Sequence, residues 1–299
     1  MTVLLCGGTG ALGSAVASRL AERGVDFRAL VRPGTDGSAL QQLGARLVVG
    51  DLADPDSLPA AVDGVETVVT TATAIGRLLA GAKNLSIAGV DEKGNAALID
   101  AAERAGASTF VFVSMAGLNE EVAARAPSAM AKLRTEHKLD ASPLRQVVVR
   151  PTKFQEVWLS PQTGMDPAKR RAVIYGKGQA LEAQVATDDV AQLCVRLATD
   201  ADPPKVVEFG GPEALSASQV VDIFERAFGA KFRRIKVPRQ ALALGSKALA
   251  RAKPEVASVM GMALYYDLHG STADSRPLEQ LGIAPRSTSA YIAQVAAAG

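Results

Sequence analysis

The sequence has few of the residues that build metal sites and disulfide frameworks. Its 299 residues include only two cysteines and two histidines. Cys6 and Cys194 lie in separate apolar segments, so we expect both to be small core residues of a protein in a reducing compartment. His137 and His269 have no cysteine or carboxylate at metal-ligand spacing, so the sequence predicts no zinc site.

A strong net charge and long apolar runs are also missing. Lysine and arginine exceed aspartate and glutamate by 33 to 31, which gives a net charge of +2 and no field that would attract nucleic acid or an anionic membrane. No apolar run reaches membrane-spanning length, and the N-terminus lacks the pattern of a signal peptide. We therefore expect a cytoplasmic monomer or homodimer that acts on a small molecule, without a nucleic-acid or membrane partner.

A glycine-rich turn near the N-terminus is the most informative motif. The apolar segment 3–6 is typical of a buried strand, and a segment of helical composition follows the turn and ends at Gly24. Between them, one glycine permits a tight turn, a second lets backbone N–H groups approach a pyrophosphate, and a third lets the helix pack closely. The order of strand, glycine turn and helix predicts a dinucleotide site whose candidate residues are Gly7, Thr9, Gly10, Ala11, Leu12 and Gly13.

Strand-like and helical segments alternate through the first half of the chain. Further strands are expected at 26–32, 46–51, 65–71, 109–114 and 145–150. Several are near-continuous apolar runs, which is typical of a parallel sheet covered by helices on both faces. The sequence therefore predicts a doubly wound, parallel-sheet α/β domain of the Rossmann type.

The regular alternation breaks beyond Pro151. We expect residues 1–154 to form the dinucleotide-binding domain, with 180–210 returning to it. Residues 155–179 and 211–299 are then expected to form a smaller C-terminal substrate lobe. Asp188 and Asp189 precede a predicted helix and are expected to cap it.

Two more helix starts carry capping signals. Asp54 is the expected N-cap of a helix that extends to residue 62, with Pro55 at its first position. Ser216 is the expected N-cap of a helix that extends to residue 228. Between the fourth and fifth strands we expect a loop over 75–89 and a helix over 91–104.

Ligands in such sheets bind outside the carboxyl ends of the strands, so the residues that close each strand are candidates for the site. Arg32 closes the second strand, with no acidic residue nearby, and an arginine there suits the 2′-phosphate of NADP(H). The alternative is an arginine that simply extends along the strand end. Asp51 and Leu52 close the third strand and suit the edge and face of an adenine, although Asp51 can equally cap the next turn.

The fourth strand ends in small residues. Thr71, Ala72 and Thr73 leave room for the ribose and nicotinamide, although threonine also occurs in strands through propensity alone.

The glycine turn and several strand ends form a set of short motifs, at 7–13, 30–33, 50–52, 110–114 and 148–151. Together they resemble the atypical short-chain dehydrogenase/reductases, most closely their NmrA-like and isoflavone-reductase-like NAD(P)H-binding branch. The similarity spans roughly residues 1–215, and the C-terminal third is less diagnostic.

This resemblance implies a catalytic role that the sequence matches only in part. Many members of the family use a Tyr-x-x-x-Lys pair, in which the lysine lowers the pKa of the phenol. Lys132 takes the place of the lysine here, but Ser128 stands where the tyrosine would be, and a serine hydroxyl is a poor proton donor. Isoflavone-reductase-like enzymes resemble this arrangement, because they retain the lysine without the tyrosine. The resemblance implies that Lys132 binds the cofactor ribose and acts as general acid or base, with Ser114 as a second catalytic candidate. The alternative is a solvent-facing Lys132.

The segment after the sixth strand is where the family closes over the nicotinamide. Pro151, Thr152 and Phe154 are the candidates to flank the cofactor there. Lys153, Trp158 and Tyr175 are the candidates for the substrate. Lys153 is expected to bind an anionic substrate group or to pair with a neighbouring carboxylate, and the two aromatic residues can equally belong to the core of the lobe.

These observations favour an NADPH-dependent oxidoreductase that transfers hydride to a small carbonyl compound or a polarised double bond. The missing tyrosine keeps a non-catalytic NADP(H)-binding sensor or assembly protein as an alternative. A nucleotide-sugar epimerase is a third possibility, which the same absence disfavours.

Overall fold

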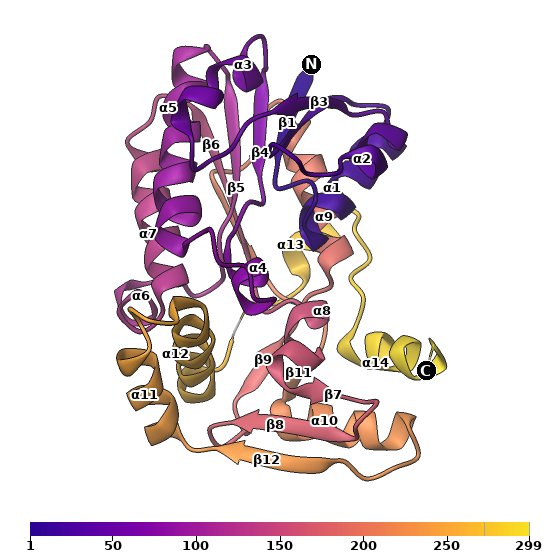
Figure 1. Ribbon diagram of the computed structural model, residues 1–299. Helices are drawn as coiled ribbons and strands as arrows, with labels where there is room; N and C mark the ends of the chain where they lie inside the picture. The colour runs from indigo at the N-terminus through magenta and orange to yellow at the C-terminus, as the bar shows by residue number, and fades with distance from the viewer. Residues whose placement is uncertain (272, 299) are drawn as a thin grey trace. The chain divides into compact units, whose positions relative to one another are not determined.

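The computed structural model describes residues 1–271 and 273–298, and the chain divides into two compact units (Figure 1). The first unit comprises residues 1–114, 131–150 and 190–207, and the second comprises 115–130, 151–189 and 208–299. Both units are therefore assembled from segments that are far apart in the sequence. Within the described ranges, no helix is long and apolar enough to span a membrane.

The first unit is built on a seven-stranded sheet in the order β10-β6-β5-β4-β1-β2-β3. All neighbouring pairs from β3 to β6 are parallel. This order is that of a doubly wound dinucleotide-binding sheet, and its direction reverses between β1 and β4. The predicted doubly wound α/β fold is confirmed. Its strands are β1 (Thr2–Cys6), β2 (Asp26–Val31), β3 (Arg46–Val49), β4 (Thr67–Thr70), β5 (Thr109–Val113), β6 (Arg145–Pro151) and β10 (Val206–Phe209).

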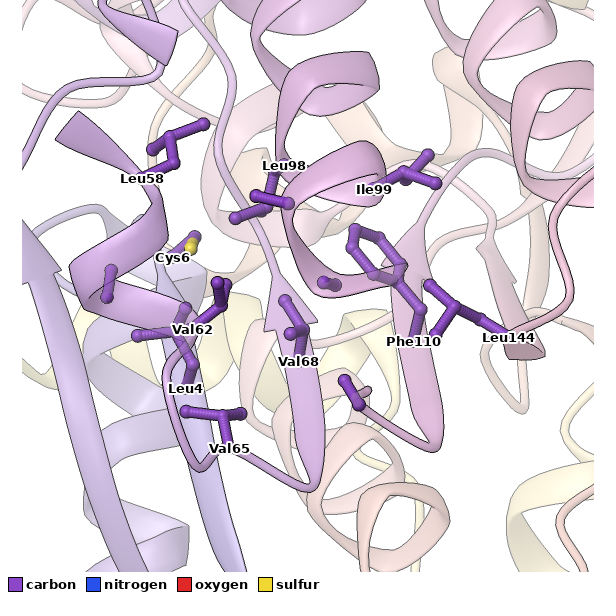
Figure 2. Close-up of a cluster of buried hydrophobic side chains, with 14 of the residues drawn as sticks. Leu4, Cys6, Leu58, Val62, Val65, Val68, Leu98, Ile99, Phe110 and Leu144 are labelled. Atoms are coloured by element: carbon purple, nitrogen blue, oxygen red, sulfur yellow. The ribbon is translucent and has the colours of Figure 1, made fainter. Parts of the chain in front are cut away.

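Helices cover both faces of this sheet. The helices α1 (Ala11–Glu22) and α9 (Thr187–Ala198) lie on one side, and α5 (Asn95–Arg104) and α7 (Pro127–Asp140) lie on the other (Figure 1). On the α5 side, Leu98 and Ile99 project toward Val68 of β4 and Phe110 of β5, and all four side chains are fully buried (Figure 2). The burial of each such side chain stabilises the fold by roughly 1.5–3 kcal/mol. Both cysteines are buried and free, as predicted.

The segment after β4 differs from the predicted loop over 75–89 and helix from 91. It contains a short helix, α4 (Ile75–Leu79), and a π-helical turn, η2 (Ala88–Gly94), directly before α5. The carbonyl oxygen of Asp91 in this turn accepts hydrogen bonds from Asn95 Nδ2 at 3.1 Å and from Thr135 Oγ1 at 3.0 Å. Polar side chains therefore satisfy a main-chain group inside a widened turn, a feature that is frequent at functional sites.

The predicted helix over 54–62 is also broken. It consists of a 3₁₀ turn, η1 (Pro55–Ser57), and a single helical turn, α3 (Pro59–Val62), because Pro59 has no N–H to continue the first turn. Asp54 takes the predicted N-cap position and Pro55 follows it, but the Asp54 carboxylate makes no capping bond. Ser57 Oγ instead donates to the carbonyl oxygen of Asp54 at 2.6 Å. The remaining helix of this unit is α2 (Ser38–Gln42).

The second unit contains a three-stranded sheet in the order β12-β8-β7 and a two-stranded sheet of β11 and β9. The helix α10 (Ala217–Ala227) begins at a capping box in which Ser216 and Gln219 bond reciprocally, as the Ser216 N-cap predicted. The other elements are α6 (Glu120–Arg125), α8 (Gln155–Trp158), η3 (Pro161–Thr163), β7 (Met165–Asp166), β8 (Arg171–Tyr175), β9 (Leu181–Ala183), β11 (Ala214–Ser216), β12 (Arg233–Val237), α11 (Arg239–Ala248), α12 (Pro254–His269), α13 (Arg276–Gln280) and α14 (Thr288–Ala298).

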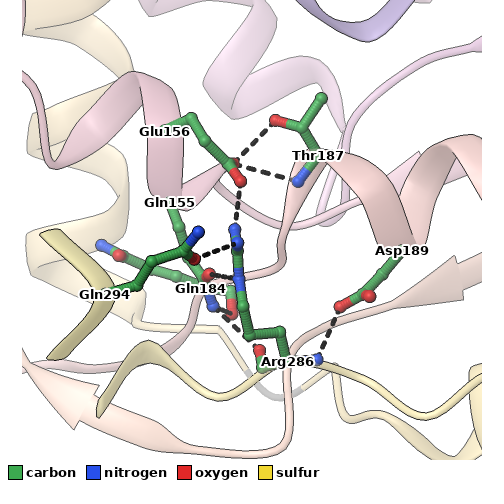
Figure 3. Close-up of polar contacts among 7 residues, drawn as sticks. All are labelled: Gln155, Glu156, Gln184, Thr187, Asp189, Arg286 and Gln294. Atoms are coloured by element: carbon green, nitrogen blue, oxygen red, sulfur yellow. Dashed lines mark hydrogen bonds and ion pairs between the residues drawn. The ribbon is translucent and has the colours of Figure 1, made fainter. Parts of the chain in front are cut away.

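The start of α9 shows that the prediction for Asp189 is wrong. This residue lies inside the first turn, and its Oδ2 accepts the backbone N–H of Arg286 at 2.9 Å rather than capping the helix (Figure 3). The helix end is instead held by Glu156, whose Oε2 accepts the N–H of Thr187 at 2.9 Å and its hydroxyl at 2.7 Å. The guanidinium of Arg286 pairs with the same carboxylate. Asp189 is thereby used to hold a distant segment of the second unit.

Candidate cofactor and substrate site

The glycine turn joins β1 to α1 where the order of the sheet reverses. Gly7 has φ of +88°, and a Cβ on this residue would lie 2.7 Å from Thr71 Oγ1 and 2.8 Å from the nitrogen of Ala72. A Cβ on Gly13 would lie 2.0 Å from the carbonyl oxygen of Gly7. Only glycine fits at either position. The turn therefore brings the predicted residues after β4 next to the N-terminus of α1.

The N-terminus of α1 is suited to an anion. Gly10 occupies the N-cap position and offers no side-chain hydrogen bond, and the first turn carries no acidic residue. Thr9, Gly10 and Ala11 are exposed, and Leu12 is half-buried. Free N–H groups and the positive end of the helix dipole both favour a phosphate here. These residues fit the pyrophosphate of a dinucleotide.

The ends of β2 and β3 carry the predicted adenosine residues. Arg32 is half-buried, and its side chain has no hydrogen bond or ion pair with any other described residue. Asp51 Oδ1 accepts the N–H of Ala53 at 3.0 Å, so this carboxylate does cap its own turn. Leu52 is 7% exposed and belongs to the core of the first unit. A free cation at the end of β2 remains available to a phosphate.

The residues after β4 are fixed by a buried carboxylate. Thr73 Oγ1 donates to Asp91 Oδ1 at 2.5 Å, and the N–H of Ala74 donates to Asp91 Oδ2 at 2.8 Å. Thr71 Oγ1 donates to the carbonyl oxygen of Cys6 at 3.2 Å. The segment 71–74 is therefore tied both to β1 and to the π-helical turn.

Two candidate catalytic groups lie together at the carboxyl end of β5. Lys132 Nζ, which extends from α7, donates to the carbonyl oxygen of Val113 at 2.7 Å and lies 5.4 Å from the ring centre of Phe112. The adjacent Ser114 is 3% exposed, and its hydroxyl has no hydrogen-bond partner among the described residues. A buried hydroxyl without a partner loses about 1–3 kcal/mol, which a bound ligand can recover.

Burial shifts two pKa values in opposite directions at this strand end. It lowers the pKa of Lys132, against the attraction of Asp91 and Glu136. It also raises the pKa of Asp91, against the hydrogen bonds from Thr73 and Ala74 and the attraction of Lys132. Both shifts are toward the neutral form. The side chain of Lys132 is half-buried and its Nζ is held by the carbonyl oxygen of Val113, so Lys132 is not a solvent-facing lysine. Perturbed groups of this kind are frequent at functional sites.

Ser128 lies on α7, four residues before Lys132, and is 4% exposed. Its N–H donates to Ser258 Oγ at 3.0 Å, and its own hydroxyl lies 4.0 Å from Met262 Sδ. This environment is a packing contact with α12. It provides no phenol and no substitute for one.

The three residues predicted to flank the nicotinamide lie in the second unit. Pro151 ends β6, and Thr152 Oγ1 donates to the carbonyl oxygen of Ala183 at 2.5 Å. Phe154 forms an isolated parallel bridge with Val185. Their contact with a cofactor stays a prediction.

The predicted substrate residues Lys153, Trp158 and Tyr175 line one pocket of the second unit. Lys153 Nζ lies 2.6 Å from Glu182 Oε2, and both side chains are largely buried. The same nitrogen lies 4.3 Å from the ring centre of Trp158 and 4.5 Å from that of Tyr266. Of the two roles left open for Lys153, the structure shows the pairing with a carboxylate.

The sequence did not predict several residues of the cofactor site in the first unit and of the pocket in the second unit. Asp91 and Thr135 lie in segments recognised only as helical, and an aspartate four residues before Asn95 was the available signal. Glu182 and Gln184 lie in one extended segment and Tyr266 lies in the distant helix α12, and no motif connects the two segments. No group of three or more His, Cys, Asp or Glu residues that could hold a metal lies within 1–271 and 273–298.

The chain is similar to a known family and to known proteins over much of its length. Residues 7–201 match the profile of a family described as NAD(P)H-binding. The photosystem II assembly factor Ycf39 of Trieres chinensis is 29% identical over 248 residues, which cover 83% of this chain and 75% of Ycf39. An NAD(P)H azoreductase of Xenophilus azovorans is 26% identical over 241 residues, which cover 79% and 77% of the two chains.

Solved structures agree on the fold. The NADPH-dependent quinone oxidoreductase QOR2 of Escherichia coli, crystallised with NADPH, superposes with a TM-score of 0.79 over 98% of this chain and 99% of its own, at 19% identity. An isoflavone reductase superposes with a TM-score of 0.71 over 98% and 99%, at 20% identity. The chain therefore belongs to the NAD(P)H-binding family, and it shares its fold with this quinone oxidoreductase and this isoflavone reductase.

Proposed function

We propose that the chain is an NADPH-dependent oxidoreductase that transfers hydride to a small carbonyl compound or a polarised double bond. The observation that carries the proposal is the end of β5. The carbonyl of Val113 holds the ammonium of Lys132, and the next residue, Ser114, has a buried hydroxyl with no partner within 1–271 and 273–298. Hydrogen-bond donors in a water-poor site stabilise an oxygen atom that gains negative charge during reduction.

The preference for NADPH over NADH is supported by Arg32. Its guanidinium has no partner among the residues that the structure describes. It follows β2, the position where a 2′-phosphate is recognised in such sheets. NADPH, when bound, supplies the hydride, and the protein supplies orientation and a proton.

The chain's own residues then have separable roles. The glycine turn would hold the pyrophosphate, Asp51 and Leu52 the adenine, and segment 71–73 the ribose and nicotinamide. Lys132 would hold the ribose and act in proton transfer. Pro151, Thr152 and Phe154 would flank the nicotinamide, and the pocket at Lys153 would bind part of the substrate.

The first unit would thus act as the dinucleotide-binding part and the second as the substrate-binding part. We further propose that the protein works in the cytoplasm and is a monomer or homodimer. Size-exclusion chromatography with light scattering would measure the mass and so test the oligomeric state.

A second candidate function is a non-catalytic NADP(H)-binding assembly or regulatory protein. Two observations favour it: the similarity to the assembly factor Ycf39 and the serine at the tyrosine place, Ser128. In that role the same first unit would bind the cofactor without hydride transfer.

Calorimetric titration with NADPH and NADH, followed by an assay of NADPH oxidation with aldehydes, enones and quinones, separates these functions. If the chain is an oxidoreductase, we expect tight binding of NADPH and oxidation of NADPH that depends on one class of acceptor. Binding without oxidation by any acceptor would favour the assembly role, and absence of binding would contradict both.

A further inference from the structure

The second unit contains a pocket of about 60 Å³. Its lysine, Lys153, suggests a site for an anion, but the other polar groups of the lining do not fit one. We infer that this pocket binds an uncharged group that donates a hydrogen bond, an O–H or N–H, at the end of an apolar ligand. If the ligand is the substrate, the inference rests on the oxidoreductase proposed above and specifies its substrate class.

The positive charge in the pocket is already neutralised. Lys153 Nζ lies 2.6 Å from Glu182 Oε2, with side-chain exposures of 10% and 13%, and the rings of Trp158 and Tyr266 lie against the ammonium. An anionic ligand would have to displace a buried carboxylate from its partner. Breaking a buried ion pair in this way is strongly unfavourable, so the pocket disfavours anions.

The second polar feature is an acceptor that lacks a donor. Gln184 is 9% exposed, and its Oε1 has no hydrogen-bond partner in the described part of the chain. Glu182 and Gln184 are two residues apart in an extended segment, so their side chains project from the same side, and both line the pocket. A ligand donor that reaches Gln184 Oε1 would remove the free-energy penalty of the unpaired buried oxygen.

Two hydroxyl groups of the pocket are committed elsewhere. Tyr175 donates to the carbonyl oxygen of Thr163 at 2.9 Å, and Thr163 Oγ1 donates to the carbonyl oxygen of Val157 at 2.8 Å. The rest of the lining is mainly apolar: Leu159, Met165, Val173, Leu215, Val220 and Val221. The small volume suits one terminal group rather than a whole substrate.

Trp158 is the only tryptophan of the chain and lines this pocket, so its emission reports binding directly. The protein without cofactor is titrated with benzyl alcohol, benzamide, anisole and benzoate, with excitation at the red edge of tryptophan absorption. We expect saturable changes with benzyl alcohol, benzamide or both, and binding about tenfold weaker for anisole, which has no donor, and for benzoate. Benzoate or anisole binding as tightly as both donors would overturn the inference. The alcohol and the amide show which donor the site prefers.

Gln184→Met tests the acceptor, with the exposed Gln280→Met as a matched control. We expect Gln184→Met to lose about tenfold in donor binding while keeping its anisole binding, and Gln280→Met to change neither. Unchanged donor binding in Gln184→Met would contradict the inference. If this variant does not fold, as judged by circular dichroism, the probe selectivity of the unaltered chain decides alone. NADPH is absent from these titrations, so a failure to transfer hydride would count against the proposed function and not against the pocket.

Discussion

The ammonium nitrogen of Lys132 lies 2.7 Å from the carbonyl oxygen of Val113, the residue directly before the unpartnered Ser114. This contact holds a lysine from α7 at the end of β5, and the next residue of the chain carries a buried hydroxyl that nothing in the described chain satisfies. The helix α7 supplies the ammonium of Lys132 and the strand end supplies the hydroxyl of Ser114. Both residues are far in sequence from the glycine turn at residues 7–13.

Ser114→Ala should separate activity from stability. Removing an unpartnered buried hydroxyl should change the free energy of unfolding by no more than about 1 kcal/mol, and can stabilise the fold. The loss of a donor to the reacting oxygen should lower kcat/KM by roughly a hundredfold. Denaturant unfolding and steady-state kinetics measure the two effects. Ser128→Ala, which alters the serine at the tyrosine place, should leave kcat/KM unchanged.

Lys132→Met tests the lysine without shortening the side chain. If Lys132 transfers the proton, turnover should fall by roughly a hundredfold or more, whereas Lys138→Met on the same helix should keep full activity. Because burial lowers the pKa of Lys132, the folded chain binds fewer protons than the unfolded chain in the interval below the ordinary lysine value. The unaltered chain should therefore gain stability relative to Lys132→Met as pH rises through that interval. An identical pH dependence of both chains would contradict the burial.

Arg32→Gln should change the cofactor preference. A charge-assisted contact with the 2′-phosphate would be lost, so NADPH affinity should fall roughly ten- to a hundredfold, while NADH affinity should stay within about twofold. Calorimetric titration measures both affinities. The exposed Arg104 serves as the matched control, and Arg104→Gln should bind both cofactors normally. Equal losses for the two cofactors in Arg32→Gln would remove this residue from the phosphate site.

Asp189→Asn should alter the pH dependence of stability. Burial and the neighbouring Asp188 and Glu156 raise the pKa of Asp189 to about 6, although Arg286 opposes the shift. The folded chain holds the proton of Asp189 more tightly than the unfolded chain does. The stability that this proton gives the folded state is therefore fully present below about pH 4 and is lost as pH rises through 6. With solvent screening, Asp189→Asn should be more stable than the unaltered chain by about 1–2 kcal/mol at neutral pH and equal to it near pH 4.

Urea unfolding at the two pH values measures this difference. A constant difference between the chains at all pH values would show that Asp189 titrates normally.

The strands and the glycine turn could be predicted because their signals are local. Buried parallel strands are apolar runs, and Gly7 and Gly13 are imposed by contacts that a Cβ would violate. The place of Lys132 was available through a family pattern. The π-helical turn at Asp91 was not, because it depends on Thr135, a residue of another helix.

The pocket of the second unit could be predicted only as a set of separate candidates. Lys153 forms an ion pair with Glu182 and packs against Tyr266, which lies more than a hundred residues further along the chain. Asp189 is likewise a residue type that often caps helices, but its carboxylate instead accepts a hydrogen bond from the backbone N–H of Arg286. Long-range pairing of polar groups leaves no periodic pattern in the sequence.

The most direct test of hydride transfer uses NADPH carrying deuterium at C4 of the nicotinamide, with the acceptors that support oxidation, and mass spectrometry of the products. Only aldehydes and enones are used, because deuteride delivered to a quinone oxygen exchanges with water. We expect deuterium bound to carbon in the reduced product of the unaltered chain, and transfer slowed by roughly a hundredfold in Ser114→Ala and Lys132→Met. Tight binding of NADPH with no deuterium in any product would contradict hydride transfer and leave the chain as an NADPH-binding assembly or regulatory protein.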